Sequence, residues 1–350
     1  DTDLFVCNAG PNVLYENNGD GTFVDVTGGS GLDEKPEDLL SVAAAWFDYD
    51  SDGRPDLIVS QYTYWNPSTD EQCTSADGTE FYCSPQTVVS VPHNLYRNLG
   101  DGRFEDVTER SGFDQVRGKG MGIGIADFDR NGHQDVFVAN DTEPNFLYLN
   151  AGDGTFEEAA LYYLIAFNDL GARVSAMGAD VKDYDNDGWV DVFYNNLQNQ
   201  THALFRNAGG EYFDYMSPTT NVAAASNDYS GWSTGFIDYD NDGWKDIYSA
   251  NGDVDYLGEN AAQHDTILRN LAGQAFEDVS TNLGTDFLHV GYQRGSAFAD
   301  LNDDGFMDLV VTSLGERPRI LLNSANNGHH WMLLDLQGHR SSRDAVGAMA

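Results

Sequence analysis

The chain has 350 residues, of which 57 are acidic and 18 are basic, and its formal net charge is -39 at pH 7. Nucleic acids and anionic membranes are bound mainly through Lys and Arg, so this charge excludes both as partners. Hydrophobic residues make up 41% and aromatic residues 12%, which excludes a disordered acidic tail. No apolar stretch reaches the ~20 residues that span a bilayer, so we expect no direct membrane insertion.

The first element is a short β-like segment, residues 4–6, preceded by Asp3. This segment matches the end of a motif that recurs along the chain, D-x-[DN]-x-[DN]-G-x-x-D followed by a β-like stretch. In that alignment Asp3 holds position 9, and we expect positions 1 to 5 of this copy to lie upstream. Complete copies begin about 55 to 62 residues apart, except for a longer first interval, at Asp48, Asp127, Asp183, Asp238 and Asp300.

The motif has the composition of a metal-binding loop. Positions 1, 3, 5 and 9 offer side-chain oxygens, position 7 offers its backbone carbonyl, and the glycine at position 6 lets the chain reverse. An adaptable all-oxygen set suits Ca²⁺ better than Mg²⁺, and the absence of ligating Cys or His side chains disfavours zinc. We therefore expect about five or six calcium ions, one for each loop. The predicted ligands are Asp48, Asp50, Asp52, Arg54 and Asp56; Asp127, Asp129, Asn131, His133 and Asp135; Asp183, Asp185, Asp187, Trp189 and Asp191; Asp238, Asp240, Asp242, Trp244 and Asp246; Asp300, Asn302, Asp304, Phe306 and Asp308; and Asp3.

Two other interpretations of the loops were weighed. An EF-hand needs a glutamate at position 12 and flanking helices. Position 12 carries no glutamate in any copy, and the flanks resemble strands, so the EF-hand is excluded. The remaining alternative is a set of Asx-rich turns without metal, which five copies in register disfavour. The residues at position 12 are Val59, Val138, Tyr194, Ser249 and Val311.

Each repeat has the same order of elements: a stretch of small residues, the carboxylate loop, an apolar strand and a hairpin with an N-x-G-D-G-like turn. This order predicts an all-β fold, a β-propeller of six to seven four-stranded blades, with a solenoid of stacked hairpins as the alternative. Small residues fit an inner strand, where blades crowd together. The aromatic residues at motif position 2 are expected to pack between blades, and they are Tyr49, Phe128, Tyr184 and Tyr239.

Residues 61–93 interrupt the repeat with a polar insert. Cys73 and Cys83 within it could close a disulfide loop, which would suit an oxidising compartment, or remain free thiols. Cys7 lies in an apolar strand and is expected to be buried. Just before the cysteines, Tyr62, Tyr64 and Trp65 form either an exposed platform for a sugar or protein, or a cover over the propeller's rim.

The loop, the apolar strand after it and the N-x-G-D-G-x-F-x-D-V-T hairpin together resemble the FG-GAP/VCBS repeat, which builds calcium-binding β-propellers. Residues 326–350, with a His-Trp strand and a later R-D-x-x-G-A, are similar to the start of the ASPIC/UnbV domain. The resemblance points to the cartilage acidic protein family and its bacterial relatives. It implies a propeller over residues 1–325 followed by the start of a small, incomplete C-terminal β domain.

The resemblance implies a secreted, periplasmic or cell-surface protein in which calcium is structural. Its role would be protein interaction, adhesion or surface assembly. The expected partner is a protein or glycan at the cell surface, a surface filament or further copies of the chain. The alternative is a secreted carbohydrate-active enzyme, a polysaccharide lyase or hydrolase, which needs acidic, basic or tyrosyl groups converging in a cleft. No catalytic motif is present, so we nominate no catalytic residue and expect no enzyme.

Overall fold

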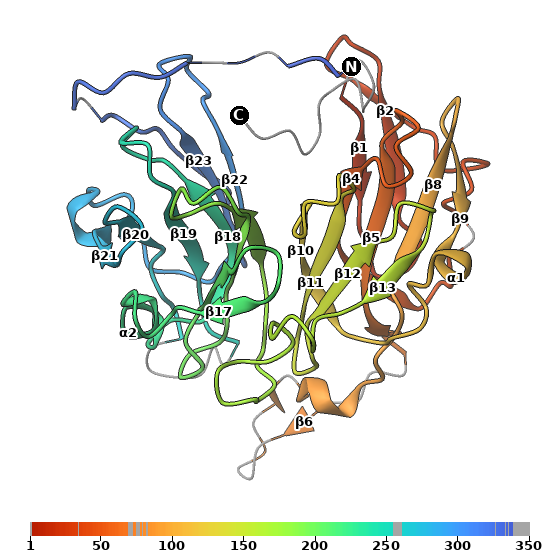
Figure 1. Cartoon of the computed structure of the whole chain (residues 1–350), viewed down its shortest axis with the longest axis horizontal. Coiled ribbons are helices and arrows are strands. Elements are labelled where there is room, and N and C mark those ends of the chain that lie inside the picture. Colours follow the sequence, from red (N-terminus) through yellow and green to blue (C-terminus); the bar gives the residue numbers. More distant parts are fainter. Residues whose placement is uncertain are drawn as a thin grey trace. The chain divides into compact units, whose positions relative to one another are not determined.

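The computed structural model describes residues 2–33, 35–68, 73–74, 78, 80–81, 83–254, 261–325, 327–332, 334 and 336–338. The chain divides into two compact units, Asp1–Tyr162 with Leu336–Ala350, and Tyr163–Asp335. Each unit is built of antiparallel sheets whose neighbouring strands follow one another along the chain (Figure 1). This arrangement is that of propeller blades, and it confirms the predicted all-β propeller class.

The first unit contains three blade sheets. The strands in each sheet pair with their neighbours in chain order, apart from a short insert between β5 and β8. The sheets are β1 (Leu4–Val6), β2 (Val13–Asn17) and β3 (Phe23–Asp25); β4 (Leu39–Phe47), β5 (Asp56–Tyr64), β8 (Asn94–Gly100) and β9 (Arg103–Asp106); and β10 (Gly120–Ala126), β11 (Asp135–Asn140), β12 (Phe146–Asn150) and β13 (Phe156–Glu158), with the short helices η1 (Pro85–Thr87) and α1 (Thr108–Ser111).

The second unit contains three further blade sheets. Within the described residues, no helix of either unit has the length and apolar character needed to cross a bilayer. The sheets are β14 (Ala179–Lys182), β15 (Asp191–Tyr194), β16 (Ala203–Asn207) and β17 (Phe213–Tyr215); β18 (Gly231–Ile237), β19 (Asp246–Asn251), β20 (Thr266–Asn270) and β21 (Phe276–Asp278); and β22 (Gln293–Ala299), β23 (Asp308–Ser313) and β24 (Arg319–Leu321), with the short helices α2 (Val222–Ser226) and η2 (Ser280–Asn282).

Two of the six sheets have three strands in the described residues, where the sequence predicts four. In the first sheet, β1 follows Asp3 and so takes the place that the second strand holds in the other blades. In the last sheet, the described residues after β24 do not return as a strand. Instead, Asn327 donates its amide to the carbonyl of Asp240, and His329 Nδ1 lies 2.9 Å from the same oxygen. The predicted C-terminal β domain, residues 326–350, lies mostly outside the described residues.

Small residues on the inner strands let neighbouring blades approach closely. A Cβ at Gly120 of β10 would lie 2.6 Å from the ring of His93 and 2.8 Å from the Cβ of Ser60 on β5. In the second unit, a Cβ at Gly235 of β18 would lie 2.4 Å from the ring of Phe298 on β22. Any larger side chain would therefore push two blades apart, which explains the small-residue stretch before each loop.

Aromatic side chains fill the spaces between blades. Tyr49 is buried in a cluster with Phe47, Phe113 and Phe156, which come from the second and third sheets and the turn between them. Tyr184 occupies the same place in the second unit. Burying one such ring contributes ~1.5–3 kcal/mol to folding. Tyr239 packs against the cluster of the last two sheets, so Tyr49, Tyr184 and Tyr239 pack between blades as predicted. Phe128 is fully buried.

The insert forms a small hairpin of β6 (Cys73–Thr74) and β7 (Glu80–Phe81), and a disulfide joins Cys73 to Cys83. Cys7 packs beside the core of the first two sheets, and burial raises its pKa to about 11, so the thiol stays neutral. Of the three aromatic residues before the cysteines, Tyr62 donates its hydroxyl to Asp141 at 2.6 Å and is not an exposed platform residue. Only Tyr64 and Trp65 are exposed, by 50% and 36%.

An asparagine at the start of each hairpin turn ties the blades together. Its backbone N–H donates to Oδ1 of the Asp at motif position 9, over 2.7 to 2.8 Å in the five complete repeats. Its side-chain amide donates to the carbonyl at position 8 of the same repeat. In three blades the same amide also reaches the carbonyl at position 2 of the preceding blade. These bonds are Asn150 to Tyr49 at 2.9 Å, Asn270 to Tyr184 at 2.8 Å and Asn323 to Tyr239 at 2.7 Å.

We predict that Asn150→Ala and Asn270→Ala each lower the free energy of unfolding by about 2–3 kcal/mol, because two buried carbonyls lose their donor. The measurement is urea denaturation at a fixed calcium concentration. Asn98→Ala is the matched control, since the described bonds of Asn98 stay within its own sheet. An equal loss in the control would contradict a specific role of the bond between blades.

Candidate metal centres

Each carboxylate loop connects the first strand of a blade to the second. Position 1 follows the last residue of β4, β10, β14, β18 or β22, and position 9 is the first residue of β5, β11, β15, β19 or β23. All five loops therefore begin and end at the same points of their blades. The two strands pair directly, as in the pair between Phe47 and Asp56, so the ends of the loop are held close together.

The loops share an unusual backbone conformation. Position 4 has a left-handed φ between 54° and 59° in all five copies, although no copy has glycine there. The glycine at position 6 has a φ between 85° and 92°. Two left-handed residues in one short turn reverse the chain. Residues other than glycine rarely adopt a φ in this region, so surrounding hydrogen bonds must hold the conformation of position 4.

Backbone N–H groups hold the carboxylates in place. The two oxygens at position 1 accept from the N–H groups of positions 5 and 6; for Asp48 both distances are 3.0 Å. The oxygen at position 5 accepts from the N–H of position 7, as Asp52 does from Arg54 at 3.0 Å. At position 9 one oxygen accepts from the hairpin asparagine and the other from position 2. A carboxylate oxygen has a second lone pair, so these bonds leave it able to coordinate a cation.

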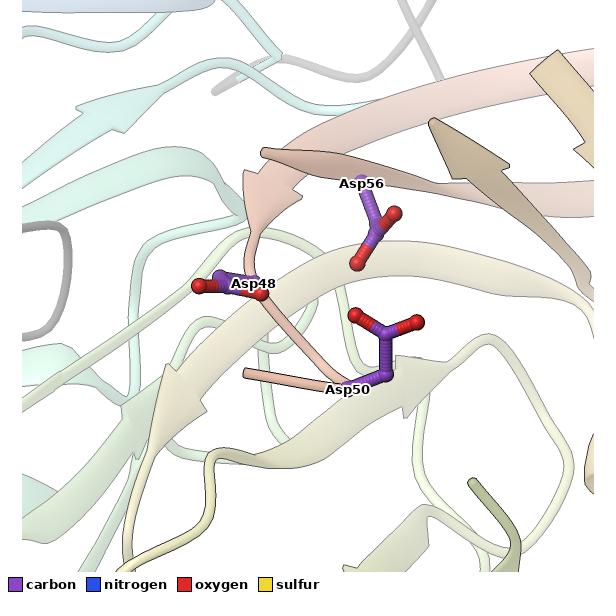
Figure 2. A group of neighbouring side chains, drawn as sticks. All are labelled: Asp48, Asp50 and Asp56. Carbon is purple, nitrogen blue, oxygen red and sulfur yellow. The ribbon is translucent and has the colours of Figure 1, made fainter. Parts of the chain in front are cut away.

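Four of the loops bring three carboxylates together. One oxygen of each carboxylate at positions 1, 3 and 9 lies within 4.8 Å of the other two. Figure 2 shows the group of the second blade, with Asp50 and Asp56 facing one another and Asp48 beside them. The other groups are Asp127, Asp129 and Asp135; Asp183, Asp185 and Asp191; and Asp238, Asp240 and Asp246.

The remaining predicted ligands lie outside these four groups. In the fifth loop Asn302 replaces the Asp at position 3, although Asp300 makes the same bonds to positions 5 and 6. Asp3 accepts from the backbone of Asn17 at 3.0 Å, which is the bond expected of position 9. The residues of positions 5 and 7 also lie outside the carboxylate groups: Asp52, Asn131, Asp187, Asp242, Asp304, Arg54, His133, Trp189, Trp244 and Phe306.

The carboxylates at position 9 show how costly the loops are without a cation. Burial, together with the neighbouring carboxylates, raises the pKa of Asp56 and Asp135 to about 7 and of Asp191 and Asp246 to about 8. The N–H groups that donate to them lower the pKa but do not offset burial. Near neutral pH each of these four loops therefore holds an unfavourable negative charge that protons or a metal ion would relieve.

The residues present fit a calcium ion. The donor set is entirely oxygen, which suits a hard cation. Oδ1 of Asp240 is buried and has no hydrogen-bond donor among the described residues, so it is available to a ligand. The carboxylates at positions 1, 3 and 9 would hold the ion, and its double charge would offset their repulsion.

Sequence reasoning missed two residues of these centres. One is the hairpin asparagine, which the sequence analysis took only as part of a turn signal although it recurs in every repeat. The other is an arginine directly before it in three repeats. Arg97 lies 2.6 Å from Asp50, and Arg269 lies 3.6 Å from Asp240. A repeated R-N pair before the turn was the available signal.

Comparison with known proteins agrees with the repeat and the loop geometry. The model of the FG-GAP-like repeat matches residues 1–59, 88–138, 127–194 and 183–249, which is more than half of the chain. The chain belongs to the FG-GAP-like repeat family. The matched FG-GAP segments include four of the five complete carboxylate loops.

Curated relatives of this FG-GAP chain include cartilage acidic protein 1 from three animals. The human protein is 27% identical over 205 residues, covering 56% of this chain and 29% of that protein. The Xenopus tropicalis protein is 29% identical over 207 residues, covering 57% and 30%, and the Mus musculus protein is 27% identical over 205 residues, covering 56% and 30%. The match therefore spans less than a third of the length of these relatives.

Among solved structures, an Agrocybe aegerita lectin described as recognising non-reducing terminal N-acetylglucosamine aligns with 92% of this chain and 80% of its own. The TM-score is 0.48 and the sequence identity 17%. A likeness of this degree says nothing about the ligands of the FG-GAP chain.

The raised pKa values predict how stability depends on pH. Without calcium, the pKa of the position 9 carboxylate in the four triad loops is raised from 3.8 to about 7 or 8 by folding, so folding takes up protons. The stability of the calcium-free protein should then fall as the pH rises from about 4 to about 8. Calcium keeps the carboxylates ionised and offsets this loss. The difference in melting temperature between calcium-loaded and calcium-stripped protein should therefore widen over this range, and a constant difference would contradict the assignment.

Proposed function

We propose that this chain is a secreted or cell-surface propeller that calcium stabilises and that acts as an interaction module in adhesion or surface assembly. The observation that carries the proposal is the recurrence of one carboxylate triad at the same point of four blades. A catalytic metal site is normally single and irregular, whereas a repeated site supports the repeated scaffold. Calcium is accordingly a structural cofactor, with one ion for each loop.

Location outside the cytoplasm is supported by the disulfide between Cys73 and Cys83, since such bonds persist in oxidising compartments. Millimolar calcium, which weak multidentate sites require, is also found there. The net charge of -39 favours partners that are neutral, basic or bridged by calcium. A protein or glycan at the cell surface, a surface filament or further copies of the chain would meet this condition.

The second candidate, a carbohydrate-active enzyme, has one observation in its favour. A pocket of about 350 Å³ in the second unit is lined in part by Asp228, Tyr229 and His264, and the Tyr229 hydroxyl lies 3.2 Å from His264 Nε2. A lyase would need Tyr229 as a base. Burial and nearby acids, Asp278 among them, raise the pKa of Tyr229 and disfavour the tyrosinate. We therefore favour the interaction module.

The test of the calcium scaffold is elemental analysis combined with thermal melting in calcium and in EGTA. We expect about five or six calcium ions per chain and a large fall in melting temperature in EGTA. Emptying several loops together leaves carboxylate pairs that each cost about 1–4 kcal/mol, against a typical domain stability of about 5–15 kcal/mol. No bound calcium and an unchanged melt would overturn the assignment and favour plain acidic turns.

Single substitutions should locate the effect in the loops. Asp185→Ala and Asp240→Ala remove one ligand each and should lower the melting temperature in calcium by several degrees, with one fewer tightly bound ion. Asp169→Ala is the control, because Asp169 is an exposed carboxylate outside the loops. Equal melting temperatures for all three variants in calcium would count against ligand roles for Asp185 and Asp240.

A further inference from the structure

One residue that neighbours the loops with a carboxylate triad differs in charge among the four blades. It is the residue directly before the hairpin asparagine, on the third strand of the blade. This residue is Arg97 on β8, Arg206 on β16 and Arg269 on β20, but Leu149 on β12. Three of the four loops therefore have a fixed positive charge on the adjacent strand, and the loop that begins at Asp127 has an apolar side chain there.

Arg97 makes the closest contact of the three arginines. Its Nε lies 2.6 Å from Oδ2 of Asp50, and its Nη2 donates to Oδ2 of Asp52 at 3.1 Å. Asp50 belongs to the carboxylate triad and Asp52 holds position 5 of the same loop. Arg54 adds a second guanidinium to Asp52. Positive charge thus lies directly on two of the expected calcium ligands.

The other arginines are held less closely. Nε of Arg269 is 3.6 Å from Oδ2 of Asp240. Arg206 donates to Asp214 at 2.8 Å and acts on its loop at longer range: burial raises the pKa of Asp185, and the charge of Arg206 opposes that rise. The contact between arginine and loop carboxylate is therefore closest in the loop that begins at Asp48. It is longer in the loop that begins at Asp238 and longest in the loop that begins at Asp183. At the loop of Asp127 the equivalent side chain is the apolar Leu149.

A guanidinium in this place has two opposite effects. It stays charged at every physiological pH, so it relieves the repulsion among the carboxylates when no metal is bound. When calcium is present, the guanidinium repels the ion and occupies lone pairs that would coordinate it. Arg97 is 33% exposed, so it can swing into solvent when the ion enters.

We propose that Arg97 is a built-in counter-ion that substitutes for calcium in the loop from Asp48 to Asp56. It lowers the calcium affinity of this loop and stabilises the loop when empty. The inference rests on the proposed function, since it assumes that the loops bind calcium. It gives the propeller sites of graded affinity: the loop beside Arg97 can lose its ion without unfolding, while the loop beside Leu149 lacks a counter-ion on the adjacent strand.

The test is a reciprocal exchange, Arg97→Leu and Leu149→Arg, measured by calcium titration against a competing chelator and by thermal melting of calcium-stripped protein. Arg97→Leu should tighten one binding step by about tenfold and lower the melting temperature of the stripped protein. Leu149→Arg should weaken a different step by a similar factor and leave the stripped protein at least as stable. The decisive result is that Arg97→Leu raises the calcium affinity while it lowers the stability of the calcium-stripped protein. Removal of a purely structural arginine would lower both the affinity and the stability.

Two further variants serve as controls. Arg103→Leu removes the same charge from β9, where the side chain is exposed, and should change neither quantity. Arg97→Lys keeps the charge and should keep most of the low affinity. If the wild type binds no calcium, the proposed function fails and this inference with it. If the wild type binds calcium but Arg97→Leu binds it no more tightly, only the counter-ion role is overturned. If Arg97→Leu does not fold without calcium, the Leu149→Arg variant decides. A calcium affinity of Leu149→Arg equal to that of the wild type would overturn the counter-ion role.

Discussion

The structure depends on one electrostatic constraint, which is the crowding of three carboxylates in four of the blades, in the loop between the first and second strands. Their oxygens lie within 4.8 Å of one another, and the residue at position 9 is fully buried in all four groups. At such distances each pair of charges costs about 1–4 kcal/mol, depending on the local dielectric. Backbone N–H groups reduce this cost but cannot remove it. Protons or a cation would relieve this cost at several equivalent places in the fold.

The loops are also part of the contacts between blades, so the effect of a cation is not confined to one loop. In the second unit, Asn186 at position 4 donates to the carbonyl of Gly243 in the next loop at 3.3 Å, and Asn241 donates to that of Gly305 at 3.0 Å. The hairpin asparagine adds a bond to the preceding blade. A loop that loses its conformation therefore withdraws bonds from its neighbours, which makes the blades of a unit cooperative.

A repeated scaffold of this kind leaves recognition to the residues that do not repeat. The same fold can serve many functions, so the repeat itself does not identify a partner. The disulfide hairpin between β5 and β8 has no counterpart in the other described blades, and the exposed Tyr64 and Trp65 lie at its base. Aromatic side chains with both an apolar face and a polar edge are favoured at binding surfaces. This part of the first unit combines a disulfide-linked hairpin with exposed aromatic side chains.

The sequence by itself determined the fold class, the places of the carboxylate loops and the burial of most position 2 aromatics, because these follow from a local motif and its period. It did not determine contacts between residues far apart in the chain. Only the tertiary structure decided that the carboxylates at positions 1, 3 and 9 gather in four loops, that Tyr62 turns to Asp141, and that Arg97 reaches Asp50. It also decided that Asn327, after β24, binds the loop of the preceding blade through the carbonyl of Asp240. The physical reason is that a periodic pattern fixes each blade, whereas the contacts that join strands and blades depend on how the blades pack.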